Sequence, residues 1–252
     1  MTKLQRHDKI LEEIQKSGFC TIDDLVYYCE VTPQTIRRDL NELARKGEVL
    51  RHHGGAGIVT NTENTSYKMR KLSNLIGKKK MAEELVKMIP DGASLFINIG
   101  TTNEIIAKAL LQHKNLKIVT NSLQVALTLG GKSDFSVVIA GGEVRYRDGG
   151  VIGVATLDFI KEFNMDFGII GISGIDSDGS LLDFDYREVK VAQAIMRNSR
   201  HVILCADKSK FGRHAMIRLG NISQVDHFFT DATPPSTIRA VLEQHQIKVH
   251  VV

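Results

Sequence analysis

From Gly77 to the C-terminus, short apolar runs rich in β-forming residues alternate with stretches of helical pattern. The runs are SLFINIG, LKIVTN, FSVVIAGG, FGIIGISGI, HVILCAD, HFFTD and KVHVV; the helical stretches are MAEELVKMI, NEIIAKALLQH, SLQVALTL, REVKVAQAIMRN and PSTIRAVLEQH. Runs that are apolar on both faces and are separated by helices are typical of a parallel sheet covered on both sides. We therefore expect residues 77–252 to form a mostly parallel α/β domain.

The N-terminal residues show a different, helical pattern. Residues 4–17 place Leu4, Ile10, Leu11 and Ile14 on one face of a helix. After Gly18, the Thr21 and Asp24 pair has the spacing of a capping box. This pair predicts the start of a short second helix that buries Leu25 and Val26.

A third helix and a hairpin follow. Thr32 is the expected N-cap, and Pro33 suits the first helical position because its missing N–H is not needed there. The helix should run to about Lys46, and the sequence VLRHHGGAGIV then reads as a β-hairpin around Gly54-Gly55. These elements predict a winged helix-turn-helix over residues 1–58, with the helix-turn-helix at about 20–39.

The exposed face of the third helix carries the residue types that read DNA. Ile36, Leu40 and Leu43 should face the core, and polar side chains occupy the opposite side. Arg can bind guanine, and Gln or Asn can bind adenine, in the major groove. We expect base readout mainly from Gln34, Thr35 and Arg38. Further contacts, mainly to phosphates, are expected from Thr32, Arg37, Asn41, Arg45, Arg51 and His52.

Charge is distributed unevenly along the chain. Residues 1–57 hold nine basic and nine acidic residues, so a DNA-binding face requires sorting of charges onto one side. Residues 59–76 are polar and lack periodicity, which predicts a linker. The surrounding residues 58–80 carry six basic residues and one acidic residue. We interpret this basic run as a solvated linker in preference to a direct phosphate contact.

The ends of several expected strands carry groups suited to a small polyol phosphate. In SLFINIGTTNEIIAKAL, the turn Gly100-Thr101-Thr102 joins a strand to a helix N-terminus, where backbone N–H groups attract an anion. Ligands of open α/β sheets bind at the carboxyl ends of strands. The other expected effector contacts are Asn121, Ser122, Gly141, Gly142, Arg147, Asp148, Asp185, Lys208 and Lys210.

Other classes of protein and site fit poorly. No apolar run approaches the roughly 20 residues needed to cross a membrane, and the N-terminus is no secretory signal, so we expect a cytoplasmic protein. The three cysteines have no zinc spacing, and the adjacent His52 and His53 point to opposite faces of a hairpin. DSDG lacks the acidic positions of a calcium loop, and no G-x-G-x-x-G follows a strand. No metal or cofactor is expected.

Several segments carry a family resemblance. TPQTIRRDLNELARKG followed by RHHGGA resembles the head of the DeoR family of bacterial repressors, and IGTT, IVTN, AGGEVR, DFDYREVK and ADKSKFG resemble its effector domain. The resemblance implies a homotetramer that binds operator DNA. RDGGVIGVATLDFI and FGIIGISGIDSDGSLLDFDY are similar to a member that controls glycerol use. That similarity implies glycerol-3-phosphate as inducer and a repressor of genes for glycerol and glycerol-3-phosphate metabolism.

The effector domain of this family is similar to ribose-5-phosphate isomerase. On that comparison Gly100, Thr101 and Thr102 match the phosphate loop, and Glu188 falls near the catalytic glutamate. The acidic pair that the isomerase carries after its next long strand is not matched, because that strand ends ISGID here, so no catalytic residue is expected. Three alternatives stay open: an isomerase with a DNA-binding appendage, a repressor that senses another sugar phosphate, and an activator.

Overall fold

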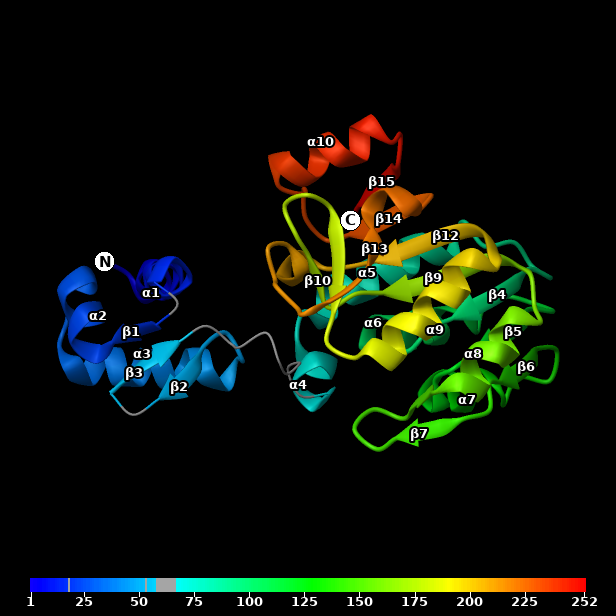
Figure 1. Cartoon of the computed structure of the whole chain (residues 1–252), viewed down its shortest axis with the longest axis horizontal. Coiled ribbons are helices and arrows are strands. Elements are labelled where there is room, and N and C mark those ends of the chain that lie inside the picture. Colours follow the sequence, from blue (N-terminus) through cyan, green and yellow to red (C-terminus); the bar gives the residue numbers. More distant parts are fainter. Residues whose placement is uncertain (18, 53, 58–66) are drawn as a thin grey trace. The chain divides into compact units, whose positions relative to one another are not determined.

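The computed structural model describes residues 1–17, 19–52, 54–57 and 67–252. The chain divides into two compact units, Met1–Thr65 and Ser66–Val252, and each is described by itself (Figure 1). The first unit consists of three helices and a small sheet, and the second is built around a large sheet. Gly18 and His53, for which the sequence predicts a helix end and a hairpin position, lie outside the described residues.

The first unit has the expected winged helix-turn-helix arrangement. Helices α1 (Lys3–Ser17), α2 (Ile22–Cys29) and α3 (Pro33–Arg45) are followed by the hairpin strands β2 (Leu50–His52) and β3 (Gly55–Gly57). A short strand that the sequence did not predict, β1 (Phe19–Thr21), pairs with β3 and makes a three-stranded sheet of order β1-β3-β2. The sheet fixes the hairpin against the helices.

The caps and the core of this unit follow from the sequence. Thr21 and Asp24 form the capping box at α2, and the Thr32 hydroxyl accepts a hydrogen bond from the Thr35 N–H at α3. The buried core includes Ile10, Ile14, Leu25, Ile36, Leu40 and Leu43. Leu4, which the helical pattern placed with this core, is instead 72% exposed.

The second unit is organised on a seven-stranded sheet of order β15-β14-β12-β9-β4-β5-β6. All neighbouring strands in this sheet are parallel. The strands are β4 (Ser94–Ile97), β5 (Lys117–Thr120), β6 (Ser136–Ile139), β9 (Met165–Gly171), β12 (Ser199–Cys205), β14 (His227–Thr230) and β15 (Lys248–Val251). Each overlaps the apolar run that predicted it, although β9 and β12 begin two residues before their runs and β6 is a largely exposed edge strand.

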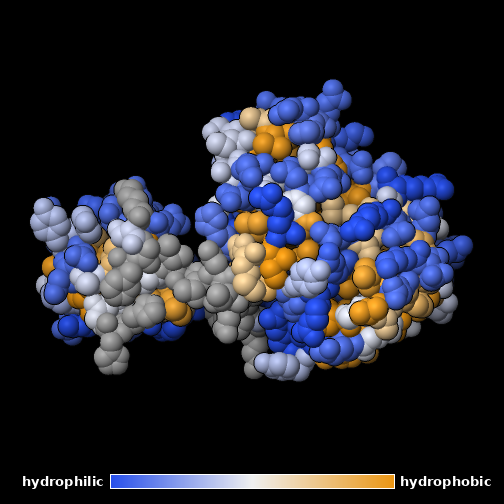
Figure 2. Space-filling view, in the orientation of Figure 1, coloured by the Kyte–Doolittle hydropathy of each residue, from blue (hydrophilic) through white to orange (hydrophobic). Residues whose placement is uncertain are grey.

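Helices cover both faces of this sheet (Figure 1). One apolar cluster contains buried residues of α5 (Leu75–Val86), α6 (Thr101–Leu110) and α7 (Leu123–Leu129). The other contains residues of α8 (Val154–Lys161), α9 (Tyr186–Arg197) and α10 (Ser236–Gln244). Burial on both faces explains why the strands read as continuous apolar runs. The face of this unit seen in Figure 2 is mostly hydrophilic, with smaller hydrophobic areas between.

Several elements of the second unit were not predicted. They are α4 (Tyr67–Leu72), α8, the ribbon of β7 (Glu143–Arg145) and β8 (Gly150–Ile152), the small sheet of β10 (Gly174–Ile175), β11 (Ser180–Asp183) and β13 (Ile217–Asn221), and the 3-10 turns η1 (Lys208–Lys210) and η2 (Ile222–Gln224). The range 59–76, assigned to a linker from its polarity, thus contains α4 and the first residues of α5 within the second unit.

The strand order contains a point where the chain reverses its direction across the sheet. From β4 the chain adds β5 and β6 on one side, and then it returns to β9 on the other side of β4. Connections therefore leave the carboxyl ends of β4 and β9 in opposite directions. Ligands of open α/β sheets bind in the crevice at such a point. In the described residues no helix is both long enough and apolar enough to cross a membrane.

Candidate functional site

The first candidate site is the exposed face of α3. Gln34, Arg37, Arg38, Asn41 and Arg45 are exposed, as predicted for DNA-reading residues. Ile36, Leu40 and Leu43 are fully buried on the opposite side of the helix, which holds this polar face toward solvent. The arrangement is chemically suited to hydrogen bonding with base edges and phosphates.

Some of the predicted DNA-binding side chains also have partners within the unit. The hydroxyls of Thr32 and Thr35 lie 3.0 Å apart, and Thr32 caps α3. Arg45 Nε donates to the Asn41 carbonyl at 3.2 Å, and Arg51 Nη1 donates to the Gly55 carbonyl at 3.0 Å across the hairpin. These contacts hold the two arginines in place. The side chain of His52 lies outside the described residues.

Helix α3 is fixed to α1 through a buried charge that the sequence did not single out. Asp39 is 1% exposed, and it accepts hydrogen bonds from Arg6 Nε at 2.5 Å and Arg6 Nη2 at 3.1 Å. His7 Nε2 lies 3.2 Å from the same carboxylate. Burial alone raises the pKa of Asp39, but the hydrogen bonds from Arg6 and His7 outweigh it and leave the pKa below its ordinary value.

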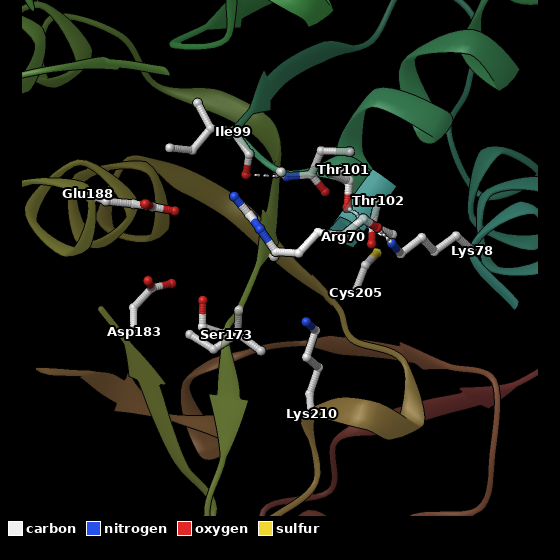
Figure 3. A pocket seen from close by; sticks show the side chains of 14 residues that line it. Arg70, Lys78, Ile99, Thr101, Thr102, Ser173, Asp183, Glu188, Cys205 and Lys210 are labelled. Carbon is white, nitrogen blue, oxygen red and sulfur yellow. Dashed lines mark hydrogen bonds between the residues drawn. The ribbon is translucent and has the colours of Figure 1, made fainter. Parts of the chain in front are cut away.

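The second candidate site is a pocket at the carboxyl ends of β4 and β9, at the reversal point of the sheet (Figure 3). Residues from α4, α5, the α6 N-terminus, β9, β11, α9 and η1 meet there. Its lining consists of Arg70, Lys78, Ile99, Gly100, Thr101, Thr102, Asn103, Gly171, Ile172, Ser173, Asp183, Glu188, Cys205 and Lys210.

The N-terminus of α6 forms one wall of this pocket. Gly100 precedes the helix with φ of 144°, a conformation that side-chain-bearing residues rarely adopt, and no side chain caps the first turn. The first backbone N–H groups and the positive end of the helix dipole therefore face the pocket. Asn103 is fully buried and donates to the Asn98 carbonyl, while its Oδ1 has no hydrogen-bond partner among the described residues.

Cationic side chains converge on this helix end. Figure 3 shows Arg70 extending across the pocket from the side of Thr101 toward Ile99 and Glu188, and Lys210 extending into the pocket from η1. Lys78 is 2% exposed, and its Nζ donates to Thr101 Oγ1 at 3.1 Å. Burial lowers the pKa of Lys78. Burial, with the nearby cations Arg213, Lys78 and Arg70, lowers the pKa of Lys210 to about 8 although Asp207 opposes this. A group of cations that repel one another is stabilised by a bound anion.

Carboxylates form the opposite wall. Asp183 and Glu188 point toward the same space as Ser173 (Figure 3). Burial raises the pKa of both carboxyls, and the charge of Asp183 raises that of Glu188 further. Arg145, itself 7% exposed, pairs with Glu188 at 2.8 Å, with Asp148 at 2.8 Å and with Asp185 at 2.9 Å. This wall therefore offers hydrogen-bond acceptors for hydroxyl groups.

The structure brings part of the predicted effector set together. Gly100, Thr101, Thr102 and Lys210 line the pocket. Asp148 and Asp185 do not line the pocket, but both pair with Arg145, which also pairs with the lining residue Glu188. Arg147 Nη2 lies 3.6 Å from Asp185. Arg70, Lys78, Asn103 and Asp183 also line the pocket and were not predicted to do so. Arg70 and Lys78 belong to the basic run of residues 58–80, which we interpreted as a solvated linker. That run was the feature of the sequence from which these two residues could have been predicted.

The remaining predicted effector residues have other contacts. Asn121 Nδ2 donates to the Val151 carbonyl, and the Ser122 hydroxyl caps α7. The Gly141 carbonyl accepts a hydrogen bond from Thr156, next to Gly142. Lys208 donates its backbone N–H to Asp231. These residues follow β5, β6 or β12 and are absent from the lining. No cluster of His, Cys, Asp or Glu that could hold a metal occurs among the described side chains.

Comparison with known proteins identifies both units. The model of the DeoR C terminal sensor domain matches residues 73–232, and that of the DeoR-like helix-turn-helix domain matches residues 6–62. The chain belongs to the DeoR family. It is therefore a regulator built from a helix-turn-helix unit and a sensor domain, as the resemblance implied, and it is not an enzyme.

Curated relatives match over the full length. The glycerol-3-phosphate regulon repressor of Escherichia coli (strain K12) is 53% identical over 100% of this chain and 100% of that protein. The protein of the same name from Haemophilus influenzae is 49% identical over 97% of this chain and 95% of the relative. The HTH-type transcriptional repressor CsqR of Escherichia coli (strain K12) is 39% identical over 99% of this chain and 95% of the relative.

Solved structures are more distant. Ribose 5-phosphate isomerase A from Methanocaldococcus jannaschii is similar over 55% of each chain, with 17% identity and a TM-score of 0.41. The structure of eIF2B delta from Chaetomium thermophilum covers 90% of this chain and 70% of its own, with 10% identity and a TM-score of 0.50, and this likeness concerns the fold alone.

Proposed function

We propose that this DeoR-family protein represses genes of glycerol and glycerol-3-phosphate metabolism and that glycerol-3-phosphate releases it from operator DNA. The observation that carries the proposal is the convergence of Arg70, Lys78 and Lys210 on the uncapped N-terminus of α6. Backbone N–H groups and cations at a helix N-terminus suit a phosphate. Two relatives at 53% and 49% identity carry the name glycerol-3-phosphate regulon repressor, which supports this choice of phosphate ester.

The two walls of the pocket match the two ends of such an effector. A phosphate placed at Thr101 and Thr102 satisfies the cationic wall. The hydroxyls of a short polyol then face Asp183 and Glu188, which accept hydrogen bonds. An inorganic phosphate fills only the cationic wall, and a pentose phosphate carries a longer carbon chain. The expected order of effectors is therefore glycerol-3-phosphate first, with both other compounds weaker.

The DNA-binding role rests on the polar face of α3. In this proposal Gln34, Thr35 and Arg38 contact base edges, and Arg37, Arg45, Arg51 and the remaining predicted residues position the unit on phosphates. We also propose a homo-oligomer, because paired heads match the two half-sites of an operator. The family resemblance implies that this oligomer is a tetramer. Sedimentation equilibrium measures the assembly directly.

Release requires a difference in affinity between two states of the protein. A ligand shifts an equilibrium only by binding one state better than the other. Moving a population from almost fully bound to almost fully released needs about 5.5 kcal/mol of differential binding. In an oligomer, several pockets share this requirement.

The decisive experiment is fluorescence anisotropy with a labelled DNA fragment from upstream of glycerol-use genes, at fixed salt. Glycerol-3-phosphate, ribose-5-phosphate and inorganic phosphate are titrated into the complex. Release by glycerol-3-phosphate at the lowest concentration supports the proposal. Release by ribose-5-phosphate instead assigns a different sugar phosphate, and binding that is indifferent to all three compounds overturns the choice of inducer.

A further inference from the structure

Helix α4 occupies a special place in the chain. It is the first helix described in the second unit, and the chain before it runs through residues 58–66, outside the described residues, to the DNA-binding unit. Arg70 lies on this helix and lines the pocket. The covalent path from the pocket to the DNA-binding unit therefore begins at α4.

Polar contacts hold Arg70 at both of its ends, and those at its carbonyl come from groups of the pocket. Its backbone carbonyl accepts hydrogen bonds from Lys78 Nζ at 2.5 Å and from Thr101 Oγ1 at 3.4 Å. Its guanidinium Nη2 lies 3.5 Å from Asp148 Oδ2. Lys78 and Thr101 are the same side chains that face the space assigned to a phosphate.

A second set of contacts fixes α4 to α6 outside the pocket. Tyr67 donates its hydroxyl to Glu104 Oε1 at 2.8 Å, and Lys71 Nζ lies 3.6 Å from Glu104 Oε2. Glu104 is 6% exposed and sits in the first turn of α6. The position of α4 thus depends on polar contacts with the helix whose N-terminus forms the phosphate wall.

A phosphate in the pocket competes for these contacts. The Thr101 hydroxyl has one proton, so it cannot donate to the phosphate and to the Arg70 carbonyl at once. A phosphate dianion also attracts the Arg70 guanidinium away from the single charge of Asp148. Both changes weaken the attachment of α4 at Arg70.

We propose that α4 carries the signal from the pocket to the DNA-binding unit, and that Arg70 is the positioning residue through which bound phosphate loosens this helix. This inference rests on the proposed function and names its route. The state with α4 anchored binds the operator, and the state with α4 loosened binds the effector. Anything that weakens the anchor then lowers DNA affinity and raises effector affinity together.

The variant Tyr67→Phe tests this route because Tyr67 lies outside the pocket lining. It removes the hydroxyl that holds α4 to Glu104 and leaves the ligand groups untouched. The matched control is Tyr146→Phe, since Tyr146 is 98% exposed and is absent from the pocket lining. Operator affinity is measured by anisotropy without effector, and glycerol-3-phosphate affinity is measured by titration calorimetry on the full-length protein without DNA.

Loss of one hydrogen bond should shift the equilibrium toward the loosened state about fivefold in Tyr67→Phe. Relative to the control, the fold-loss in operator affinity and the fold-gain in glycerol-3-phosphate affinity should therefore multiply to about fivefold. General damage to the fold weakens both affinities and cannot produce this result. Two affinities that both equal those of the control, or that weaken together, overturn the inference. A wild-type protein that responds to no phosphate compound refutes the proposed function. The comparison of operator affinities still tests the role of α4 in that case, because it is measured without effector.

Discussion

At the scale of single residues, the charge of Lys210 sets how strongly the pocket attracts an anion. Its pKa of about 8 follows from burial and from neighbouring cations. The ammonium is mostly protonated at pH 7 and mostly neutral at pH 9, while a phosphate monoester is a dianion at both. We expect glycerol-3-phosphate affinity, measured by calorimetry, to fall at least about tenfold between pH 7 and pH 9, because the protonated fraction of Lys210 alone falls by that factor.

The variant Lys210→Arg provides the control for this pH dependence, because a guanidinium stays charged throughout the range. Glu188 carries a raised pKa and becomes anionic as pH rises, which also weakens phosphate binding. Some pH dependence should therefore remain in Lys210→Arg and become smaller on adding Glu188→Gln, with Asp183 and Lys78 still able to contribute. A pH profile that Lys210→Arg leaves unchanged would show that Lys210 does not meet the phosphate.

The two threonines at the α6 N-terminus provide a second test at this scale. Replacing Thr101 and Thr102 together with Val keeps their shape and removes both hydroxyls from the phosphate wall. We expect operator affinity to fall by up to about fivefold, because the Thr101 hydroxyl also donates to the Arg70 carbonyl, while glycerol-3-phosphate no longer releases the DNA in the anisotropy assay. Thr237→Val, on the exposed face of α10, is the matched control. Normal induction in the double variant would remove these threonines from the effector site.

At the scale of elements, the attachment of α3 to α1 depends on Asp39. Asp39→Ala leaves Arg6 and His7 without their buried carboxylate. We expect the first unit to lose about 3 kcal/mol of stability, seen as faster amide hydrogen exchange in α3 and unchanged exchange in β4 and β9. Asp8→Ala, at an exposed position of α1, is the control. Exchange in α3 that matches the control would refute a stabilising role.

The same residue gives the first unit a pH dependence with a defined sign. The folded-state pKa of Asp39 is lowered, so its contribution is present above the unfolded value of about 3.9. The contribution is lost as pH falls through the lower, folded value. Acid should therefore lower the protection of α3 amides, measured relative to their intrinsic exchange rates, more in the wild-type protein than in Asp39→Ala, which has no such carboxylate to protonate.

The exposed face of α3 leads to a prediction about how the protein recognises the operator sequence. Arg38 has a side chain that is 78% exposed, with Glu42 4.0 Å away as its ion-pair partner. If it reads a guanine, Arg38→Ala should cost about 1–3 kcal/mol of operator binding and relax the sequence preference at one position. Arg200→Ala, equally exposed on β12, is the control. An equal loss on operator and on scrambled DNA would reassign Arg38 to phosphate contact.

Elements also show how far the sequence could predict the structure. The strands of the large sheet could be found because burial on both faces leaves continuous apolar runs, and the caps at Thr21 and Thr32 marked two helix starts. Helix α4 could not be found, because six residues held by polar contacts to Glu104 leave no apolar periodicity. Arg70 was missed for the same reason.

The candidate pocket was predicted in part, for a related reason. Ligands of open α/β sheets bind at the carboxyl ends of strands, at the point where the chain reverses across the sheet. In this sheet that point lies between β4 and β9. Gly100, Thr101 and Thr102 follow β4 and line the pocket, whereas Asn121 and Ser122 follow β5 and bond locally. Strand order is set by tertiary packing, and the sequence alone gave no means to choose among the ends.

At the scale of the whole molecule, a DNA-binding unit and a sensor unit on one chain must influence each other equally. If glycerol-3-phosphate weakens operator binding by some factor, the operator weakens glycerol-3-phosphate binding by the same factor. We expect this factor to lie at about 5–150-fold. Calorimetric titration of effector into the free protein and into the operator complex, beside anisotropy with and without effector, measures both directions.

The equality of these two factors also distinguishes a phosphate compound that acts through the pocket from one that acts on the DNA. A phosphate compound that merely screens the DNA charges weakens operator binding, yet its own binding to the protein is unaffected by the operator. The two factors would then differ, and the proposal of an effector pocket would fail. With Thr101 and Thr102 both changed to Val, the two factors should fall to about one together, because the pocket no longer holds the phosphate that links the units.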